Sequence, residues 1–224
     1  MSEQSTTPPP PPPPPPHKGD PEWWRRRFSG LTGLGLSDEE RAANRAEAEC
    51  RKCEKNRDYL MNYSPIVCFM LENIAKLNGR MDDSNIKCMP CENLQSGGFS
   101  PEYGVLLCQN RLRDRGHTED TLAHELVHVY DHLRFRVDWE ELKHHACSEI
   151  RASSLSGECR WMREAFTRGV FHFTRQHQAC VKRRAILSVQ NNPKCKNEAE
   201  ATKIVNQVFD SCFTDTRPFS EIYR

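Results

Sequence analysis

The chain has 224 residues, of which 37% are hydrophobic, so it can form one domain with a buried core once a disordered end is subtracted. Its 32 Lys and Arg residues balance its 31 Asp and Glu residues. Because almost no net charge remains, binding to nucleic acid through bulk electrostatics is not supported.

The first 20 residues have low complexity. Nine consecutive prolines, Pro8 to Pro16, predict a disordered, proline-rich tail with nothing to bury. A solvated spacer is the simpler interpretation, and docking of the prolines into an aromatic groove of a partner is the alternative. We expect one globular domain over residues 21–224, beginning near Trp23.

Aromatic and basic residues follow the tail in the run Trp23-Trp24-Arg25-Arg26-Arg27-Phe28. This run fits either a solvated face or contact with an anionic membrane surface. The longest apolar run, residues 65–71, is far shorter than the roughly 20 residues that cross a bilayer. Neither a secretory signal nor an Arg-rich presequence is recognisable at the N-terminus. We therefore expect any membrane association to be peripheral.

Two helices are predicted next. Ser37-Asp38-Glu39-Glu40 resembles a capping box and predicts a polar helix to about Tyr63. Ser64-Pro65 opens an apolar helix that ends at Asn78-Gly79.

Short extended segments are then predicted near residues 86–88 and 104–108, with Gly97-Gly98 turning the chain between them. The edge strand of such a small sheet can hold the backbone of an extended peptide. Residues 104–108 are the candidate for that edge strand, and a plain core strand is the alternative.

The run His124-Glu125-Leu126-Val127-His128 indicates the chemistry. Residues four apart share one face of a helix, so both imidazoles can bind one zinc ion, while Glu125 can take a proton from zinc-bound water. This is the pattern of a metalloprotease. A charged surface helix is the alternative, but the capping residues 118–121 and the apolar neighbours predict a buried helix. In such a helix, unpaired His and Glu would be costly.

A catalytic zinc usually has three protein ligands and one position open to water. Glu149, on a following helix, is the preferred third ligand, and His132, His144 and His145 are the alternatives. Zinc on this site would lower the pKa of bound water to about 7, and Glu125 would pass the proton of that water to the leaving amine.

The oxyanion donor is not fixed by the sequence. His145 and Tyr130 are the candidates, and His145 could instead support the ligands from behind. Asp131 and Asp138 are candidates for orienting the ligand imidazoles.

Helices are also expected over residues 159–166, 176–190 and 198–213, with Asn191-Asn192-Pro193 breaking the chain between the last two. The expected fold class is α+β and mostly helical: a zincin-like metallopeptidase domain with a small sheet beside the motif helix.

The motif and several flanking segments resemble the family of mitochondrial inner membrane zinc metalloproteases that process ATP synthase subunit a. The resemblance lies in residues 124–128, in Asp138-Trp139, in the long block 142–159, and in residues 23–26, 104–112 and 215–219. It thus spans nearly everything after the proline tract. It implies that His124 and His128 are ligands and that Glu125 is the catalytic glutamate, and the block also matches at Glu149.

The resemblance further implies a location and a task. The family acts as peripheral zinc peptidases on the intermembrane-space face of the inner membrane, where they trim the N-terminus of the subunit a precursor. They also work with other inner-membrane assembly factors to build the membrane sector of ATP synthase, a role that does not need proteolysis. Turnover of lipid-transfer proteins in that space is a further implied activity.

Eleven cysteines are spread along the chain. In a reducing compartment, Cys50-x-x-Cys53 and Cys88-x-x-Cys91 would form a second, structural zinc site. In an oxidising compartment most cysteines would form disulfides, and their wide spread favours disulfides that join helices. The intermembrane space fits this interpretation. The odd count leaves one free thiol, and we expect it at Cys68, within the apolar run.

Two other classes of protein remain as alternatives to an enzyme that acts mainly by proteolysis. One is a zinc-containing assembly factor whose peptidase site is incidental to its task. The other is a non-proteolytic, disulfide-rich assembly or interaction protein. Replacing Glu125 by Gln separates them, because zinc binding should persist while hydrolysis stops.

Overall fold

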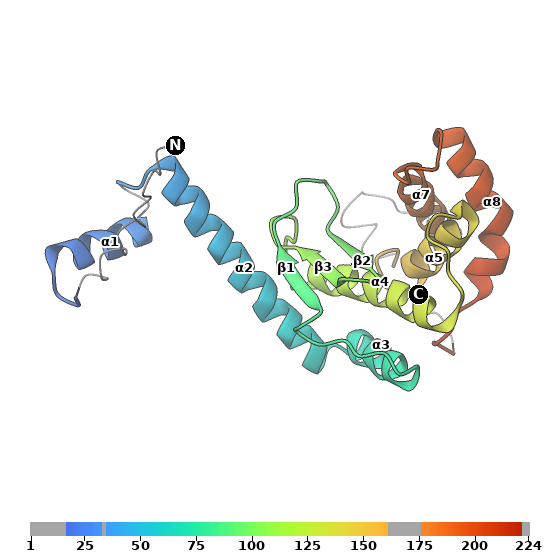
Figure 1. The fold of residues 1–224 in the computed structure, drawn as a ribbon, viewed down its shortest axis with the longest axis horizontal. Coiled ribbons are helices and arrows are strands. Elements are labelled where there is room, and N and C mark those ends of the chain that lie inside the picture. Colours follow the sequence, from blue (N-terminus) through green and yellow to red (C-terminus); the bar gives the residue numbers. More distant parts are fainter. Residues whose placement is uncertain (1–16, 33–34, 161–175, 221–224) are drawn as a thin grey trace, which may run out of the picture. The chain divides into compact units, whose positions relative to one another are not determined.

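A computed structural model describes residues 17–32, 35–160 and 176–220 of the chain (Figure 1). The chain divides into two compact units, Met1–Arg45 and Ala46–Arg224. The polyproline run lies outside the described residues, so the expected domain boundary near residue 20 stays a prediction. The described part is mostly helical with one three-stranded sheet, which confirms that aspect of the predicted fold class.

The first unit contains helix α1 (Pro21–Thr32) and the beginning of helix α2 (Asp38–Tyr63). Trp23 and Trp24 are in edge-to-face contact in α1. The predicted capping box is present at the start of α2: the Glu40 amide donates to Ser37 Oγ, and the Ser37 amide donates to Glu40 Oε2. The predicted extent of α2 is confirmed.

Helix α3 (Pro65–Lys76) follows α2 after Ser64, whose hydroxyl accepts a hydrogen bond from the Val67 amide. The helix ends near Asn78, which adopts φ +61°. Both ends agree with the prediction. Buried residues of α2 and α3, among them Leu60 and Met70, join the first hydrophobic core.

The sheet contains β1 (Ile86–Met89), β2 (Gly97–Ser100) and β3 (Gly104–Cys108) in the order β1-β3-β2. β3 is parallel to β1 and antiparallel to β2, so it is the central strand. The expectation that residues 104–108 form the edge strand is therefore wrong. The expected turn at Gly97-Gly98 is also wrong, because these glycines are extended and pair with Leu107 and Leu106.

Helix α4 (Arg115–Arg134) lies against β2 and β3, and Figure 1 shows it behind the strands. It begins one turn earlier than the residues 118–121 that the sequence indicated as its cap. Asp114 is the N-cap, and its carboxylate accepts from the His117 amide at 2.8 Å. The Thr118 hydroxyl instead donates back to the Asp114 carbonyl inside the first turn.

Helices α5 (Leu142–Leu155), α7 (Gln176–Gln190) and α8 (Glu198–Thr214) pack on one another and form a second core. The predicted extents of α7 and α8 are confirmed. The helix expected at residues 159–166 is not present at Cys159 and Arg160, and the rest of that range lies outside the described residues. Because α5 contributes Ala152 and Leu155 to the first core and Ala146 and Ile150 to the second, it joins the two.

Four disulfides connect these elements, as the spread of cysteines predicted: Cys53–Cys88, Cys91–Cys108, Cys147–Cys212 and Cys159–Cys180. The alternative of a Cys₄ zinc site is wrong, because Cys53, Cys88 and Cys91 are all in disulfides. Cys68 is free, as expected, but Cys50 and Cys195 are free as well. The expectation of a single free thiol is therefore wrong, and no feature of the sequence separated these two cysteines from the paired ones.

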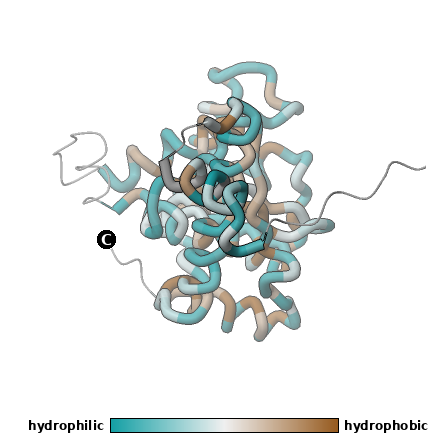
Figure 2. Tube along the Cα trace, turned by 90° about the vertical axis from the view of Figure 1, so that its left-hand side faces the viewer, coloured by the Kyte–Doolittle hydropathy of each residue, from teal (hydrophilic) through white to brown (hydrophobic). Residues whose placement is uncertain are grey.

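Hydrophobic stretches along the described chain are short and interrupted by hydrophilic residues (Figure 2). Among the described helices, none combines the length and the apolar character that a membrane span requires.

Candidate metal centre and active site

Two imidazoles and one carboxylate converge where α4 meets α5. His124 and His128 lie one turn apart on α4, and Glu149 lies on α5. His124 Nε2 is 3.6 Å from Glu149 Oε2, and His128 Nε2 is 3.3 Å from Glu149 Oε1. One donor atom from each of the three residues falls within 4.8 Å of the other two. The structure thus brings together the three ligands that the sequence predicted.

A buried ion pair fixes α5 against α4 at this point. The Arg151 guanidinium of α5 donates to both Asp131 oxygens of α4, with Nε at 3.0 Å from Oδ1 and 3.1 Å from Oδ2. Both side chains are only 2% exposed. Small residues on α5, including Ala146 and Ser148, are buried and let the two helices approach closely. This contact places Glu149 opposite the two histidines.

The same ion pair orients His128 through Ser148. The Ser148 hydroxyl donates to Asp131 Oδ2 at 3.0 Å and lies 2.8 Å from His128 Nδ1. Because the single hydroxyl proton is used on Asp131, Ser148 accepts the Nδ1 proton of His128. The lone pair of His128 is then on Nε2, which faces Glu149, and this is the arrangement that a metal ligand needs. Asp131 therefore lies where the sequence placed a supporting residue, although it acts through Ser148.

A carboxylate supports His124 in the corresponding position. Glu158 Oε1 is 3.2 Å from His124 Nδ1, and Glu158 Oε2 is 2.6 Å from the Arg184 guanidinium. Burial would raise the pKa of Glu158, but His124 and Arg184 hold it below its usual value, so the group is a carboxylate and accepts the Nδ1 proton. Sequence reasoning did not assign a role to Glu158 or Arg184, because their pairing depends on where the chain turns after α5.

The charges in this region favour a cation between the histidines and Glu149. Burial would raise the pKa of Glu149, yet the charge of His128 and hydrogen bonds with His124, His128 and His145 hold it well below its usual value. Burial would lower the pKa of His124, yet Glu158 and Glu149 hold it well above its usual value. A metal ion bound to Nε2 of His124 would take the place of the proton on that nitrogen. Its positive charge would then balance the same two carboxylates, Glu149 and Glu158.

The donor set fits a divalent metal. Both imidazoles have their Nδ1 atoms engaged, which leaves the two Nε2 atoms and one ionised carboxylate directed at a common point. Two His nitrogens and one Glu oxygen are a known ligand set of catalytic zinc.

Glu125 lies next to this point on α4 and is 6% exposed. Burial raises its pKa, although the nearby His124 and His128 oppose the shift. Strand β2 approaches Glu125 so closely that a Cβ atom on Gly97 would be 3.2 Å from Glu125 Oε1 and 3.0 Å from the Leu106 carbonyl oxygen. A glycine at this position therefore lets the edge of the sheet lie directly beside the carboxylate.

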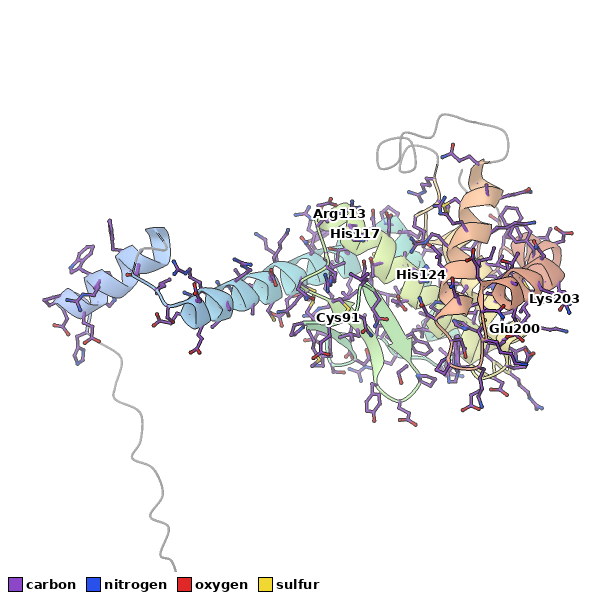
Figure 3. All side chains as sticks on the ribbon, turned by 90° about the horizontal axis from the view of Figure 1, so that it is seen from above. Cys91, Arg113, His117, His124, Glu200 and Lys203 are labelled. Atoms are coloured by element: carbon purple, nitrogen blue, oxygen red, sulfur yellow. A yellow bond between two sulfur atoms is a disulfide. The ribbon has the colours of Figure 1, made fainter. Side chains whose placement is uncertain are left out.

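The site opens into a cleft of about 820 Å³. The cleft is lined by all three predicted ligands and Glu125, by Gly97, Gly98 and Phe99 of β2, and by Arg183, Arg184 and Leu187 of α7. In Figure 3, His124 lies on α4 next to the C-terminal helices, while His117 and Arg113 lie towards the beginning of that helix. The cleft thus runs between the edge strand and α7, with the candidate ligands in its floor.

The remaining predicted residues have different positions. His145 lines the cleft with Nε2 at 3.5 Å from Glu149 Oε1, and its Nδ1 lies 2.9 Å from Asn192 Nδ2. Tyr130 is a buried member of the first core and is not among the described residues that line the cleft. His144 accepts a hydrogen bond from the Asp138 amide at Nδ1, and His132 packs near Trp139. His132 and His144 therefore lie outside the set of converging donor atoms.

The converging His, His and Glu set, with a buried glutamate beside it and an edge strand along the cleft, is the arrangement expected of a metallopeptidase. The Peptidase M76 family model matches residues 51–220. The chain belongs to this family.

Several relatives support the same assignment. The mitochondrial inner membrane protease atp23 of Neosartorya fischeri is 57% identical over 216 residues, which cover 92% of this chain and 91% of the relative. The protein of the same name from Saccharomyces cerevisiae is 55% identical over 217 residues, which cover 91% of this chain and 96% of the relative. The protein of the same name from Coccidioides immitis is 53% identical over 215 residues, which cover 92% of this chain and 91% of the relative. No solved structure matches the chain.

Proposed function

We propose that this metallopeptidase is a zincin-like zinc endopeptidase, with His124, His128 and Glu149 as the metal ligands and Glu125 as the catalytic base. The observation that carries the proposal is the convergence of both Nε2 atoms and the Glu149 carboxylate within 4.8 Å, directly beside a buried glutamate. A purely structural zinc site would use thiolate ligands, and among the described residues no cysteine belongs to this cluster of donor atoms.

The chain's own residues divide the work of hydrolysis. When bound, zinc supplies a Lewis acid that polarises a peptide carbonyl and makes water more acidic. Glu125, whose pKa is raised by burial, takes a proton from the attacking water and delivers it to the leaving amine nitrogen.

Strand β2 is the proposed substrate-binding edge. Among the described strands it pairs only with β3, so its outer side offers backbone groups to an extended peptide along the cleft. His145 is proposed to hold Glu149 in place, since its Nε2 faces that carboxylate. His145 also remains the better placed of the two predicted oxyanion donors, because it lines the cleft and Tyr130 does not.

For the substrate we propose the N-terminal extension of ATP synthase subunit a. The support is the resemblance of the segments around the metal site, together with relatives that carry the name mitochondrial inner membrane protease. The proposed location is the intermembrane-space face of the inner membrane, where the four disulfides can form. We further propose that the protein assists assembly of the ATP synthase membrane sector with other assembly factors, and that it degrades lipid-transfer proteins.

The decisive experiment replaces Glu125 by Gln in the full chain. Zinc content should stay at the wild-type level, while the rate of cleavage of the subunit a precursor should fall by about 10²–10⁴-fold, the usual contribution of a positioned base. Glu140→Gln is the matched control, because the Glu140 side chain is 79% exposed and lies outside the cleft lining.

Two outcomes separate the proposed activities. Unchanged processing in the Glu125→Gln variant, measured by mass spectrometry of the product N-terminus, would contradict the enzyme proposal. Loss of processing with normal assembly of the ATP synthase would mean that the assembly role is real and independent of proteolysis.

Helix α1 is the proposed membrane contact. Trp24 and Phe28 lie one turn apart and are 59% and 62% exposed, and Arg25 and Arg27 are exposed beside them. Exposed aromatic and cationic residues on one short helix suit the interface of an anionic lipid surface.

Sedimentation with phospholipid vesicles tests this contact. Binding should require anionic lipid, weaken with salt and fall in a Trp24→Ser/Phe28→Ser variant, while Tyr103→Ser, which removes another exposed aromatic residue, should bind normally. Equal binding by both variants would contradict the assignment to α1.

A further inference from the structure

The segment that follows α5 brings a carboxylate back to the metal site. Helix α5 ends at Leu155, and Gly157 then adopts φ +91°, a conformation that suits glycine. A Cβ atom at this position would also lie 2.8 Å from the Arg160 side chain. This turn directs Glu158 towards α4, where its carboxylate meets His124.

Helix α7 anchors this segment at two neighbouring points. Cys159, the residue after Glu158, is 1% exposed and forms a disulfide with Cys180 of α7. Arg184 lies one turn beyond Cys180 on the same helix and binds Glu158 Oε2 at 2.6 Å. A covalent bond and a charge-assisted hydrogen bond from one helix thus fix the direction in which the Glu158 carboxylate points.

The two histidines are supported in unlike ways. His128 donates to the neutral hydroxyl of Ser148. The carboxylate of Asp131 accepts from that hydroxyl and supports the imidazole only through it. His124 Nδ1 lies 3.2 Å from one carboxylate oxygen of Glu158, whose other oxygen is paired with Arg184. A carboxylate that accepts the Nδ1 proton makes the other imidazole nitrogen a stronger donor to a metal and holds the ring in one orientation.

Building on the proposed zinc site, we infer that Glu158 is a positioning residue for the metal: it orients and polarises His124, and Arg184 together with the Cys159–Cys180 disulfide holds it in place. It does not contact the substrate's reacting atoms in this role. Loss of the carboxylate should therefore be detected first in zinc affinity, before any substrate is added.

The test measures the zinc dissociation constant by competition with a chelator in the full, oxidised chain. Glu158→Ala should weaken zinc binding by about 10–100-fold, the usual effect of removing a group that supports a ligand. Glu158→Gln keeps an oxygen that can accept the Nδ1 proton but loses the charge, so its affinity should lie between those of wild type and Glu158→Ala. Glu140→Gln, with an exposed carboxylate, should match wild type.

A spectroscopic measurement distinguishes positioning from a general loss of structure. In the zinc-loaded protein labelled with ¹⁵N-histidine, the Nδ1 proton of His124 should be shifted downfield and protected from exchange. This signal should weaken in Glu158→Gln and disappear in Glu158→Ala, while the Nδ1 proton of His128, bound to Ser148, should be unchanged.

Each result decides the matter. Wild-type zinc affinity in Glu158→Ala, or an unchanged His124 signal, would overturn the inference while leaving the zinc peptidase intact. If Glu158→Ala does not fold, Glu158→Gln alone decides, and wild-type affinity in that variant would overturn the inference. A wild-type protein that binds no zinc would instead refute the proposed function itself.

Discussion

Replacing Arg151 by Met should destabilise the second unit by about 3–5 kcal/mol, the usual cost of leaving one member of a buried ion pair alone. Arg151 is 2% exposed and neutralises Asp131, which is also 2% exposed. It also binds the carboxylate of Asp215 at 2.8 Å and the carbonyls of Asp215 and Arg217. A single substitution would therefore remove the contacts that join α5 both to α4 and to the segment after α8. For a unit of this size the loss corresponds to a fall of about 6–20 °C in Tm.

Guanidinium denaturation of the metal-free protein, with disulfides intact and followed by far-UV circular dichroism, measures this loss. Arg217→Met is the matched control: the Arg217 side chain pairs with the same Asp215, but it is 55% exposed, so its loss should cost less than about 1 kcal/mol. Equal effects of the two substitutions would refute the reasoning, because burial of the charge would then not determine the cost.

The pH dependence of the same variant has a definite sign. Burial already raises the pKa of Asp131, and Arg151 opposes that rise. Without Arg151 the pKa rises further above the unfolded value of about 3.9, so the folded state binds the proton more tightly than the unfolded state does. The deficit relative to wild type should be complete above the folded pKa and should shrink as the pH falls towards the unfolded value. The double variant Asp131→Asn/Arg151→Met, which removes both charges, should recover part of the stability at neutral pH.

Three further predictions concern the cleft, the metal and a disulfide. Gly97→Ala should destabilise the protein by about 1–3 kcal/mol and reduce peptidase activity, because the new Cβ would lie 2.7 Å from Thr121 Cγ2 and 3.0 Å from a backbone carbonyl. Gly98→Ala, where the new Cβ would meet only Gln95 at 3.8 Å, should be nearly neutral in stability. Removal of the metal by a chelator should abolish peptidase activity and lower the Tm. Zinc added at 100 times its dissociation constant should restore about 2.7 kcal/mol of stability. A Tm that does not respond to zinc would contradict a zinc site in the folded protein. Replacing Cys159 and Cys180 by Ser should lower the free energy of unfolding by about 3 kcal/mol, the loop entropy expected for a separation of 21 residues. The same replacement should weaken zinc binding. An unchanged zinc affinity would show that the disulfide does not hold the Glu158 segment.

The sequence predicts those parts of the site whose residues lie on one helix, because the helical repeat fixes their relative positions. His124, Glu125 and His128 share one helix, so their mutual geometry follows from 3.6 residues per turn once the helix is recognised. Glu149 was reached by a weaker argument, from its place on a following helix. The structure places it 3.3 Å from His128 Nε2, because the buried pair of Asp131 and Arg151 fixes how α5 packs on α4.

The incorrect predictions concern features that depend on contacts distant in sequence. Gly97-Gly98 has the composition of a turn, but pairing with β3 keeps it extended, and the space beside Glu125 requires a residue without a side chain at Gly97. The sequence predicts only two strands, which makes residues 104–108 an edge, whereas β2 pairs on the other side of β3 in the structure. Glu158 received no role because it follows a helix end, and only the turn at Gly157 brings it to His124.

The buried charges explain why this unit uses several kinds of reinforcement. Glu125, Asp131, Glu149, Arg151 and Glu158 all lie in or next to the contact between α4 and α5, and burial of each carboxylate opposes folding unless a partner is present. The two hydrophobic cores are joined through α5, which also carries part of this polar layer. Two of the four disulfides tie the polar layer to α7 and α8, one through α5 itself and one through the segment after it. Because neither these disulfides nor the Arg151 pair uses a metal ion, we expect them to hold His124, His128 and Glu149 in position even in the absence of zinc. Zinc should therefore add to the stability of an already folded site.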